Sequence, residues 1–349
     1  MTPRHSDAPI HILGVGNLGK YVAHALAKSS PKPVTLIFHR KSLEDEWRAE
    51  AEAITCITDG VSDSRSRFQI ETLPAEPQDP EPIKHLIVTT KAYMTVGALG
   101  PLKRRLDSSS TVLFLQNGMG AVDEVRKSLF PTEKDKPTFL SGICSAGVYS
   151  TKPFTIVHAG TGTLLVGPAD DSAALRSATQ PELANEMLQR LSEASVLETA
   201  IVSANAIKEA QLKKLVVNAV INPLTAILRC QNGKLLDRPA VFAAATLVIE
   251  ETSTILRAMM PHLKTALSDQ TLLELFVSVA EKTGKNTSSM LQDAKAGRRT
   301  EIDYINGYFY SEAVRLGVPH RRNQLLAELV AMNAVLEAED LLGRLTTDS

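Results

Sequence analysis

The sequence has few cysteines, almost no net charge and no long apolar segment. Its three cysteines, Cys56, Cys144 and Cys230, are far apart, with no CxxC pair and no histidine cluster at zinc spacing, which argues against a disulfide framework or a metal site. The 38 basic and 39 acidic residues leave a net charge of −1, so no global field attracts nucleic acid or an anionic membrane. No apolar run approaches the roughly 18 to 20 residues that span a bilayer.

The composition is that of a globular protein in a reducing compartment. Residues 1–9 are too few and too polar for a secretory signal, so we expect a cytoplasmic protein and leave a mitochondrial address open. With 349 residues, of which 44% are hydrophobic and 22% charged, the chain has the length of two domains. Small-molecule chemistry is the function class that these observations favour.

The first half alternates short β-rich runs with helical stretches, as a doubly wound sheet requires. Helices are predicted at Lys20–Lys28 and Glu182–Ala194. Residues 65–84 are polar and contain four prolines, so we predict a surface excursion there. The predicted strands are Ile10–Leu13, Val34–His39, Leu86–Thr90, Thr111–Leu115, Phe139–Ile143, Phe154–His158, Gly162–Val166 and a short run around Glu198–Val202.

After Asn205 the β pattern is absent and long helical patterns follow, at Ala206–Leu228, Ala240–Met259 and Gln270–Lys282. We place a domain boundary near Ser203. The sequence therefore predicts an α/β domain over residues 1–203 and an all-α domain over residues 204–349.

A glycine loop, Gly14-Val15-Gly16-Asn17-Leu18-Gly19, directly follows the first predicted strand and opens a helix. In that context the glycines let a pyrophosphate approach the backbone N–H groups at the helix N-terminus. The alternative is a plain strand-to-helix turn. We predict a dinucleotide site.

The end of the second predicted strand distinguishes the two nicotinamide cofactors. An acid there would accept hydrogen bonds from the ribose hydroxyls of NAD, whereas the 2′-phosphate of NADP needs positive charge. The chain has His39-Arg40-Lys41 and no acid. Since Arg40 can give a charge-assisted, bidentate contact to phosphate, we predict NADP(H); the alternative is that Arg40 is a solvated surface charge.

Three polar residues, Lys214, Asn218 and Asn222, recur every four residues in an otherwise apolar helical segment. Each step of four advances about 40° around a helix, so they form one stripe. The stripe is either a structural network or the wall of a site. Pro223 should kink or break the helix and widen a pocket there, which favours a site.

A second polar cluster covers residues 286–293 and 298–307. By default Ser288 or Ser289 caps a helix, and the Arg298-Arg299-Thr300-Glu301 run is a solvated face.

Several blocks of this sequence resemble ketopantoate reductases. In the second half these are Val220-Ile221-Asn222-Pro223-Leu224-Thr225-Ala226 with Asn232-Gly233, Ser288-Ser289-Met290-Leu291-Gln292-Asp293, and Thr300-Glu301-Ile302-Asp303-Tyr304-Ile305-Asn306-Gly307. In the first half Thr90-Lys91-Ala92 and Gln116-Asn117-Gly118-Met119-Gly120 also resemble that family. The resemblance extends from about Ile10 to Pro319.

The resemblance implies a Rossmann-type domain, a helical domain like that of 6-phosphogluconate dehydrogenases and a substrate cleft between them. It also implies reduction of 2-dehydropantoate to pantoate by NADPH, in the synthesis of pantothenate and coenzyme A. Lys214 matches the family's proton donor, and the matches to substrate contacts are Asn218, Asn222, Asn232 and Ser289. The matches to positions that hold cofactor or organise the site are Lys91, Asn117, Val148 and Glu301.

The chemistry of these residues suits that reaction. Hydride reaches the 2-oxo carbon, and Lys214 donates a proton to the oxygen as charge develops, with Glu301 holding the lysine. Alternatives are an NADPH-dependent reductase of another 2-oxo acid and a non-catalytic NADP-binding sensor, although a sensor would usually lose the proton donor. A homodimer is left open.

Overall fold

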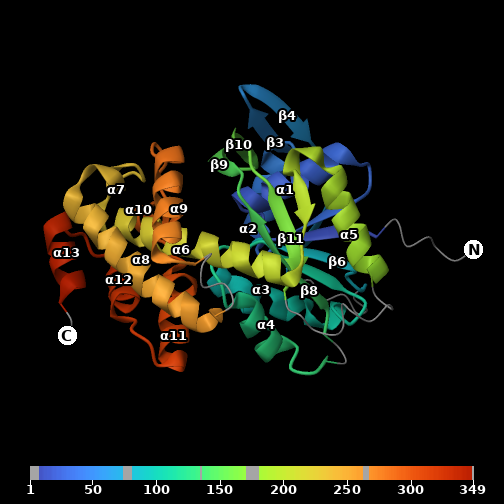
Figure 1. Cartoon of the computed structure of the whole chain (residues 1–349). Coiled ribbons are helices and arrows are strands. Elements are labelled where there is room, and N and C mark those ends of the chain that lie inside the picture. The colour runs from blue at the N-terminus through green and yellow to red at the C-terminus, as the bar shows by residue number, and fades with distance from the viewer. Residues whose placement is uncertain (1–7, 74–80, 134–135, 170–180, 262–266, 348–349) are drawn as a thin grey trace, which may run out of the picture. The chain divides into compact units, whose positions relative to one another are not determined.

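The computed structural model describes residues 8–73, 81–133, 136–169, 181–261 and 267–347 (Figure 1). Contacts within the chain divide it into two units. The first comprises Met1–Gln116 and Ala121–Lys208, and the second comprises Asn117–Gly120 and Glu209–Ser349. Helix α6 begins at Ala204, so its first residues count with the first unit.

The first unit is a mixed α/β domain. Its strands are β1 (Ile10–Leu13), β2 (Val34–Phe38), β3 (Ile54–Thr58), β4 (Val61–Arg65), β5 (Phe68–Thr72), β6 (His85–Val88), β7 (Thr111–Phe114), β8 (Thr138–Cys144), β9 (Gly147–Lys152), β10 (Thr155–Gly160), β11 (Leu164–Pro168) and β12 (Thr199–Ile201). Its helices are α1 (Asn17–Ser29), α2 (Lys41–Ala49), α3 (Thr95–Leu99), α4 (Ala121–Leu129) and α5 (Pro181–Glu193), with 3-10 turns η2 (Ala92–Met94), η3 (Gly100–Arg105) and η6 (Ser195–Leu197).

The main sheet has the strand order β12-β11-β8-β7-β6-β1-β2-β5 among the described residues. β1 lies between β2 and β6 and is parallel to both. The chain order therefore reverses beside β1, and in doubly wound sheets ligands bind at the carboxyl ends of the strands at such a reversal. The loops that follow β1 and β6 occupy this edge.

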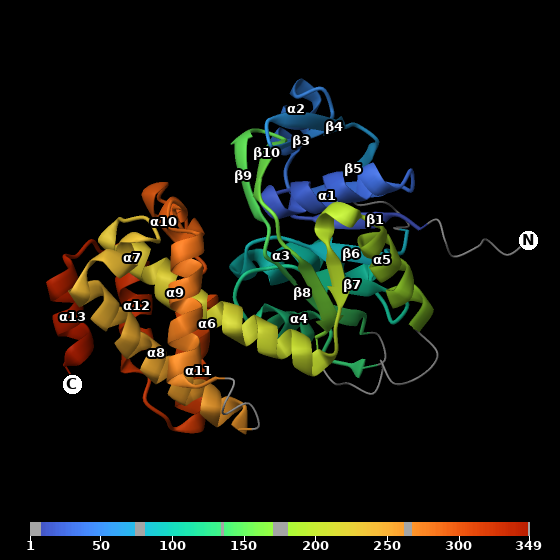
Figure 2. The ribbon, with the colours of Figure 1, turned by 45° about the horizontal axis from the view of Figure 1, so that its top comes forward.

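Alternating side chains of these strands cover the two faces of the main sheet. Ile12, Ile87 and Leu113 belong to the cluster that includes residues of α1 and α5, and Leu13, Val88 and Val112 belong to the cluster with residues of α3 and α4. Figure 2 shows α1 and α5 on one side of the sheet and α3 and α4 on the other. Strands buried on both faces explain the continuous apolar runs in the sequence.

Two features of this unit depart from the sequence prediction. β5 lies inside residues 65–84 and pairs in parallel with β2 at the sheet edge, so a surface excursion is wrong for that part. The alternation Phe68-Gln69-Ile70-Glu71 suits an edge strand with one polar face. Three of the four prolines lie in 74–80, outside the described residues. Strands β4-β3-β10-β9 also form a separate sheet, which the sequence did not predict.

The second unit has helices and no strand among its described residues. Its elements are most of α6 (Ala204–Leu228), then α7 (Lys234–Asp237), α8 (Pro239–Met259), α9 (Asp269–Lys282), α10 (Ser289–Lys295), the 3-10 turn η8 (Ile302–Tyr304), α11 (Asn306–Leu316), α12 (Arg321–Ala331) and α13 (Ala338–Thr346). α8 packs against α7, α9, α11, α12 and α13. The observed fold class, an α/β unit followed by a mostly helical one, is the one predicted.

Helix α8 is long and apolar enough to cross a membrane by length and composition, the one such helix in the described part of the chain. This differs from the expectation that no segment approaches that length. Its most apolar window is 56% buried inside the protein, and Val241, Ala244, Val248 and Ile255 belong to the helical core. The apolarity of α8 is that of a core helix.

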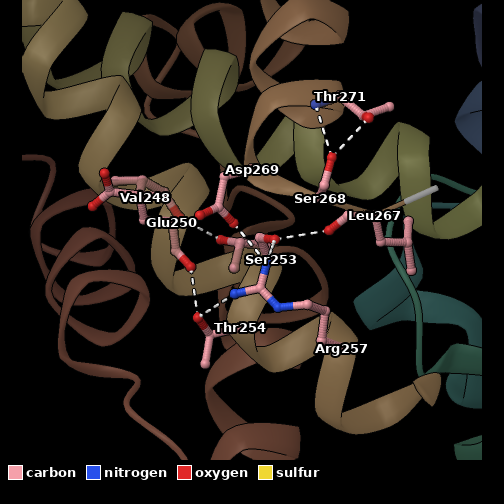
Figure 3. Close-up of polar contacts among 10 residues, drawn as sticks. Val248, Glu250, Ser253, Thr254, Arg257, Leu267, Ser268, Asp269 and Thr271 are labelled. Atoms are coloured by element: carbon pink, nitrogen blue, oxygen red, sulfur yellow. Dashed lines mark hydrogen bonds and ion pairs between the residues drawn. The ribbon is translucent and has the colours of Figure 1, made fainter. Parts of the chain in front are cut away.

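Polar contacts fix the start of α9 to the second half of α8 (Figure 3). The guanidinium of Arg257 donates to Ser253 Oγ at 2.5 Å and to Asp269 Oδ1 at 2.7 Å, and Ser253 Oγ donates to Leu267 O at 2.8 Å. Ser268 caps α9 by accepting from the backbone N–H of Thr271. These bonds hold the start of α9 against the second half of α8.

Helix α6 continues through Pro223 to Leu228, so of the kink or break predicted at Pro223 the break is wrong. A proline lacks the N–H that would bond the carbonyl four residues earlier, here that of Ala219. Asn306 Nδ2 donates to this carbonyl at 2.9 Å in its place. The helix therefore tolerates the proline because a side chain from α11 satisfies the freed carbonyl.

Candidate active site

The three loop glycines stand where a side chain would not fit or would fill open space. Gly14 has φ +101°, and a Cβ there would lie 2.6 Å from Thr90 N; a Cβ on Gly19 would collide with Gly14 O and Thr89 Oγ1. A Cβ on Gly16 would meet nothing within 4 Å. Gly14 and Gly19 thus close the strand-to-helix turn, and Gly16 leaves space in front of the helix.

Helix α1 begins without a side-chain cap, because Gly16 is its N-cap residue. The first N–H groups of a helix have no partner within it and carry partial positive charge. The uncapped N-terminus and the open space at Gly16 together form a cradle for an anionic group, which fits the pyrophosphate of a dinucleotide.

A buried lysine lies in the first turns of α1, and sequence reasoning missed it. Lys20 is 6% exposed, and burial lowers the pKa of its ammonium group. Its Nζ donates to Ser150 Oγ at 2.5 Å, and Ser150 Oγ donates to Asn17 Oδ1 at 2.5 Å. In the described part of the chain no carboxylate pairs with Lys20, and its hydrogen bonds join α1 to β9 through Ser150 and Asn17.

β9 is joined to the glycine loop by the hydrogen bond from Ser150 to Asn17. Val148 lies two residues before Ser150 on the same strand and pairs with His158 of β10, and β9 packs against α1. The structure therefore brings Val148 into the neighbourhood of the loop. The sequence signal for this placement is weak, because β9 belongs to the small sheet.

The segments after β6 and β7 are joined by Gln116. Its Nε2 donates to Thr90 O at 2.9 Å, to Thr90 Oγ1 at 3.0 Å and also to Thr95 Oγ1. Lys91 follows Thr90 directly and is the N-cap residue of η2. The backbone at Lys91 is thereby held at the carboxyl edge of the sheet, where the glycine loop also lies.

Arg40 lies at the end of β2, exposed, and is the N-cap residue of α2. Its guanidinium makes no ion pair with a described residue. The nearby acid Glu44 is engaged by Lys41 at 3.0 Å, Arg48 at 2.5 Å and Thr72 at 2.8 Å, and hydrogen bonds from Lys41 and Thr72 lower its pKa. The end of β2 thus presents an available cation beside a carboxylate that is already occupied.

In the second unit, α6 presents the predicted stripe. Lys214 and Asn218 are half-buried and Asn222 is 8% exposed, among buried Leu215, Val220 and other apolar residues of the helix. The polar groups therefore lie at the edge of an apolar core and not on a solvated face.

Asn232 and Ser289 are placed by the segments around α10. Asn232 Nδ2 donates to Thr283 Oγ1 at 2.9 Å, while its buried Oδ1 has no hydrogen-bond partner in the described structure. Ser288, not Ser289, caps α10 by accepting from Leu291 N, and it shares a 2.7 Å hydrogen bond with Thr225 of α6. Ser289 is exposed in the first turn of α10, which this bond fixes to α6 close to Asn222.

Glu301 and Asn117 belong to the same unit although they are far apart in the sequence. Glu301 is 5% exposed and accepts from Tyr304 N through its backbone carbonyl at 3.0 Å, so the prediction of a solvated face is wrong for it. Met119 N donates to Tyr304 O at 2.8 Å, and a Cβ on Gly118 (φ +83°) would lie 2.6 Å from that oxygen. Residues 117–120 therefore pack on η8, next to Glu301.

The fold and these features define a class of protein, a two-unit protein with a glycine loop of the dinucleotide-binding type and a polar stripe on a helix of a separate helical unit. Between residues 8 and 347, within the described segments, no group of three or more His, Cys, Asp or Glu is arranged to hold a metal ion.

Family models identify the chain more closely. The model described as Ketopantoate reductase PanE/ApbA matches residues 10–171, and the one described as Ketopantoate reductase PanE/ApbA C terminal matches residues 206–334. The chain belongs to the ketopantoate reductase family, whose members are oxidoreductases that use a nicotinamide cofactor.

Individual relatives agree with this assignment. A probable 2-dehydropantoate 2-reductase of Schizosaccharomyces pombe is 33% identical over 86% of this chain and 89% of its own length. The ketoisovalerate reductase BEA2 of Gibberella fujikuroi is 29% identical over 89% of this chain and 80% of its own length. Among solved structures, D-mandelate dehydrogenase with NADH and anilino(oxo)acetate has a TM-score of 0.77 at 22% identity, covering 96% and 99% of the two chains, which shows the fold.

Proposed function

We propose that this protein reduces 2-dehydropantoate to pantoate with NADPH, in the pathway to pantothenate and coenzyme A, with residues 1–203 as the cofactor domain and 204–349 as the substrate domain. The observation that supports this most is the lysine-amide stripe on α6 in a chain of the ketopantoate reductase family. A sensor without catalysis would have no need of a half-buried lysine on this stripe.

The cofactor residues follow from the cradle. The N–H groups of residues 14–19 would bind the pyrophosphate, and Lys91, Val148 and Asn117 are the further cofactor residues of this proposal. Arg40 would bind the 2′-phosphate, since its guanidinium is exposed and Glu44 is engaged elsewhere. When bound, the nicotinamide supplies the hydride that reduces the 2-oxo carbon.

Lys214 is the proton donor in this proposal. A half-buried ammonium group hydrogen-bonds the oxo oxygen more strongly as negative charge develops there, and then donates a proton to it. Glu301, a buried carboxylate, holds the position and charge of the lysine.

The amides of Asn218, Asn222 and Asn232 and the hydroxyl of Ser289 bind the carboxylate and hydroxyl groups of the substrate. Amides both donate and accept, so they suit a small acid with a neutral hydroxyl. The unpaired Oδ1 of Asn232 is available as an acceptor for such a hydroxyl.

A second candidate substrate is 2-ketoisovalerate, because relatives named ketoisovalerate reductase match most of this chain. It differs from 2-dehydropantoate by carrying a hydrogen on C3 in place of the hydroxymethyl group, so it lacks the substrate hydroxyl. A site that hydrogen-bonds a substrate hydroxyl can have a kcat/KM about 10⁴-fold lower for the analogue without it. The ratio of kcat/KM for the two substrates therefore distinguishes the two candidate functions.

The test measures the oxidation of NADPH by its absorbance, with 2-dehydropantoate, 2-ketoisovalerate and benzoylformate as substrates in parallel assays. We expect the highest kcat/KM with 2-dehydropantoate. A higher value with 2-ketoisovalerate would replace the proposed substrate, and no turnover with any 2-oxo acid would contradict the proposed reaction. Light scattering on the same sample tests for a homodimer.

A further inference from the structure

Asn306 is fully buried at the start of α11 and has no part in the proposed chemistry. Its Nδ2 donates to Ala219 O at 2.9 Å and to Asn323 Oδ1 at 3.0 Å. Ala219 lies in the turn of α6 between Asn218 and Asn222, and its carbonyl is the one that Pro223 leaves without a helical partner. The side chain of α11 thus completes the hydrogen bonding of α6 at the polar stripe.

Asn323 and Glu251 hold Asn306 in turn. Asn323 Nδ2 donates to Glu251 Oε1 at 2.9 Å and to Thr252 Oγ1 at 3.1 Å. Glu251 also accepts from the backbone N–H groups of Arg322 and Asn323, at 2.9 and 2.8 Å. Asn306, Asn323 and Glu251 are all at most 5% exposed. A buried chain of hydrogen bonds therefore runs from α8 through the start of α12 and α11 to the carbonyl of Ala219.

We propose that Asn306 is a positioning residue for the substrate amides. A proline removes the N–H that would hold the carbonyl four residues earlier, and its ring crowds that carbonyl. Asn306 supplies the missing hydrogen bond to Ala219 O, and with it fixes the peptide groups next to Asn218 and the turn that leads to Asn222. The spacing between Lys214 and the two amides is set in this way. The inference rests on the proposed function of the stripe.

The test is a double-mutant cycle between Asn306 and Pro223. Asn306→Leu removes the donor at similar volume, and Pro223→Ala gives α6 the N–H that can bond Ala219 O directly. We expect Asn306→Leu to raise KM for the 2-oxo acid and lower kcat/KM by about tenfold or more, with the Kd of NADPH unchanged. In the Pro223→Ala background the same substitution should cost less than about threefold. The loss of the bond to Asn323 is common to both backgrounds and cancels in the cycle.

Thr252→Val is the matched control, because it removes a bond at the far end of the chain without touching Ala219. It should lower the unfolding midpoint and leave kcat and KM unchanged. Equal losses from Asn306→Leu in both backgrounds, or unchanged kinetics, would overturn the proposal. If the Asn306→Leu variant does not fold, we expect the double variant with Pro223→Ala to fold. A double variant that also fails to fold would overturn the proposal.

The same cycle distinguishes this inference from the proposed function. If the unmodified protein reduces no 2-oxo acid, the proposed function fails. The coupling between Asn306 and Pro223 can then be measured in the free energy of unfolding. It still shows whether Asn306 acts through Ala219 O.

Discussion

The glycine loop of the first unit and helix α6 of the second are built in opposite ways. The loop works by omitting side chains, since Gly14 and Gly19 have no room for a Cβ and Gly16 leaves open space. Helix α6 instead keeps polar side chains in apolar surroundings and takes a hydrogen bond from α11 to remain continuous. A site that binds through backbone groups is therefore fixed by residues adjacent in sequence. A site that binds through side chains depends on neighbours distant in sequence.

The largest expected effect tests the side-chain half of this comparison. Lys214→Ala should lower kcat by about 100-fold or more, the scale of losing a positioned general acid, while the Kd of NADPH from fluorescence titration stays nearly constant. Lys213→Ala is the neighbouring control, because Lys213 pairs with Glu209 at 2.7 Å and lies off the stripe. Unchanged turnover in Lys214→Ala would refute its role.

The backbone half is tested by adding one methyl group at two glycines. Gly16→Ala should preserve the unfolding midpoint but raise the Kd of NADPH by about tenfold or more, since overpacking at a contact costs about 1–3 kcal/mol. Gly19→Ala should lower the stability of the protein itself by a similar free energy, because its Cβ collides with Gly14 O. The two variants serve as each other's control, and a stability loss at Gly16 would break the distinction.

Arg40→Ala isolates the single side chain that we assign to cofactor choice. NADPH should bind about tenfold or more weaker, as expected for a lost hydrogen bond to a charged group, and NADH nearly as before. Arg48→Ala, whose guanidinium pairs with Glu44, should leave the NADPH to NADH ratio unchanged. Equal losses for both cofactors would remove the argument for the 2′-phosphate.

The smallest effect concerns acid stability, and it distinguishes the two units. Burial, aided by the charge of Arg105, lowers the pKa of His11 from 6.5 to about 4. Between these values the unfolded chain binds a proton that the folded chain does not, so stability falls as the pH drops below 6.5. From pH 7 to pH 6 this amounts to less than about 1 kcal/mol.

His11→Gln should flatten this pH dependence in part, because burial also lowers the pKa of His24 and His85 in the same unit. The measurement is denaturant unfolding followed by fluorescence of Trp47, the single tryptophan, which lies buried in the first unit. A variant with the slope of the original protein would show that His11 titrates normally.

The sequence predicted the elements of the main sheet well, because strands buried on both faces are continuous apolar runs. It missed β5, whose Gln69 and Glu71 made the run look polar, and of the small sheet it predicted β10 but not β3, β4 and β9, of which β4 is mostly exposed. The default interpretation of residues 298–301 as a solvated face is wrong for Glu301, which is buried. The sequence also allowed Pro223 to break α6, which runs on to Leu228. No local pattern reveals that Asn306 satisfies the Ala219 carbonyl, because the two residues are 87 positions apart.

By itself the sequence determined the glycine turn between strand and helix, the class of fold and the stripe of Lys214, Asn218 and Asn222, because each depends on spacing along one strand or helix. Only the tertiary structure decided that Lys20 is buried and bonded to Ser150, that residues 117–120 pack on η8 beside Glu301, and that α6 runs unbroken through its proline. The reason is physical: a periodic pattern fixes which face of an element is apolar, but the partner of a buried polar group is chosen by whichever distant segment packs against it.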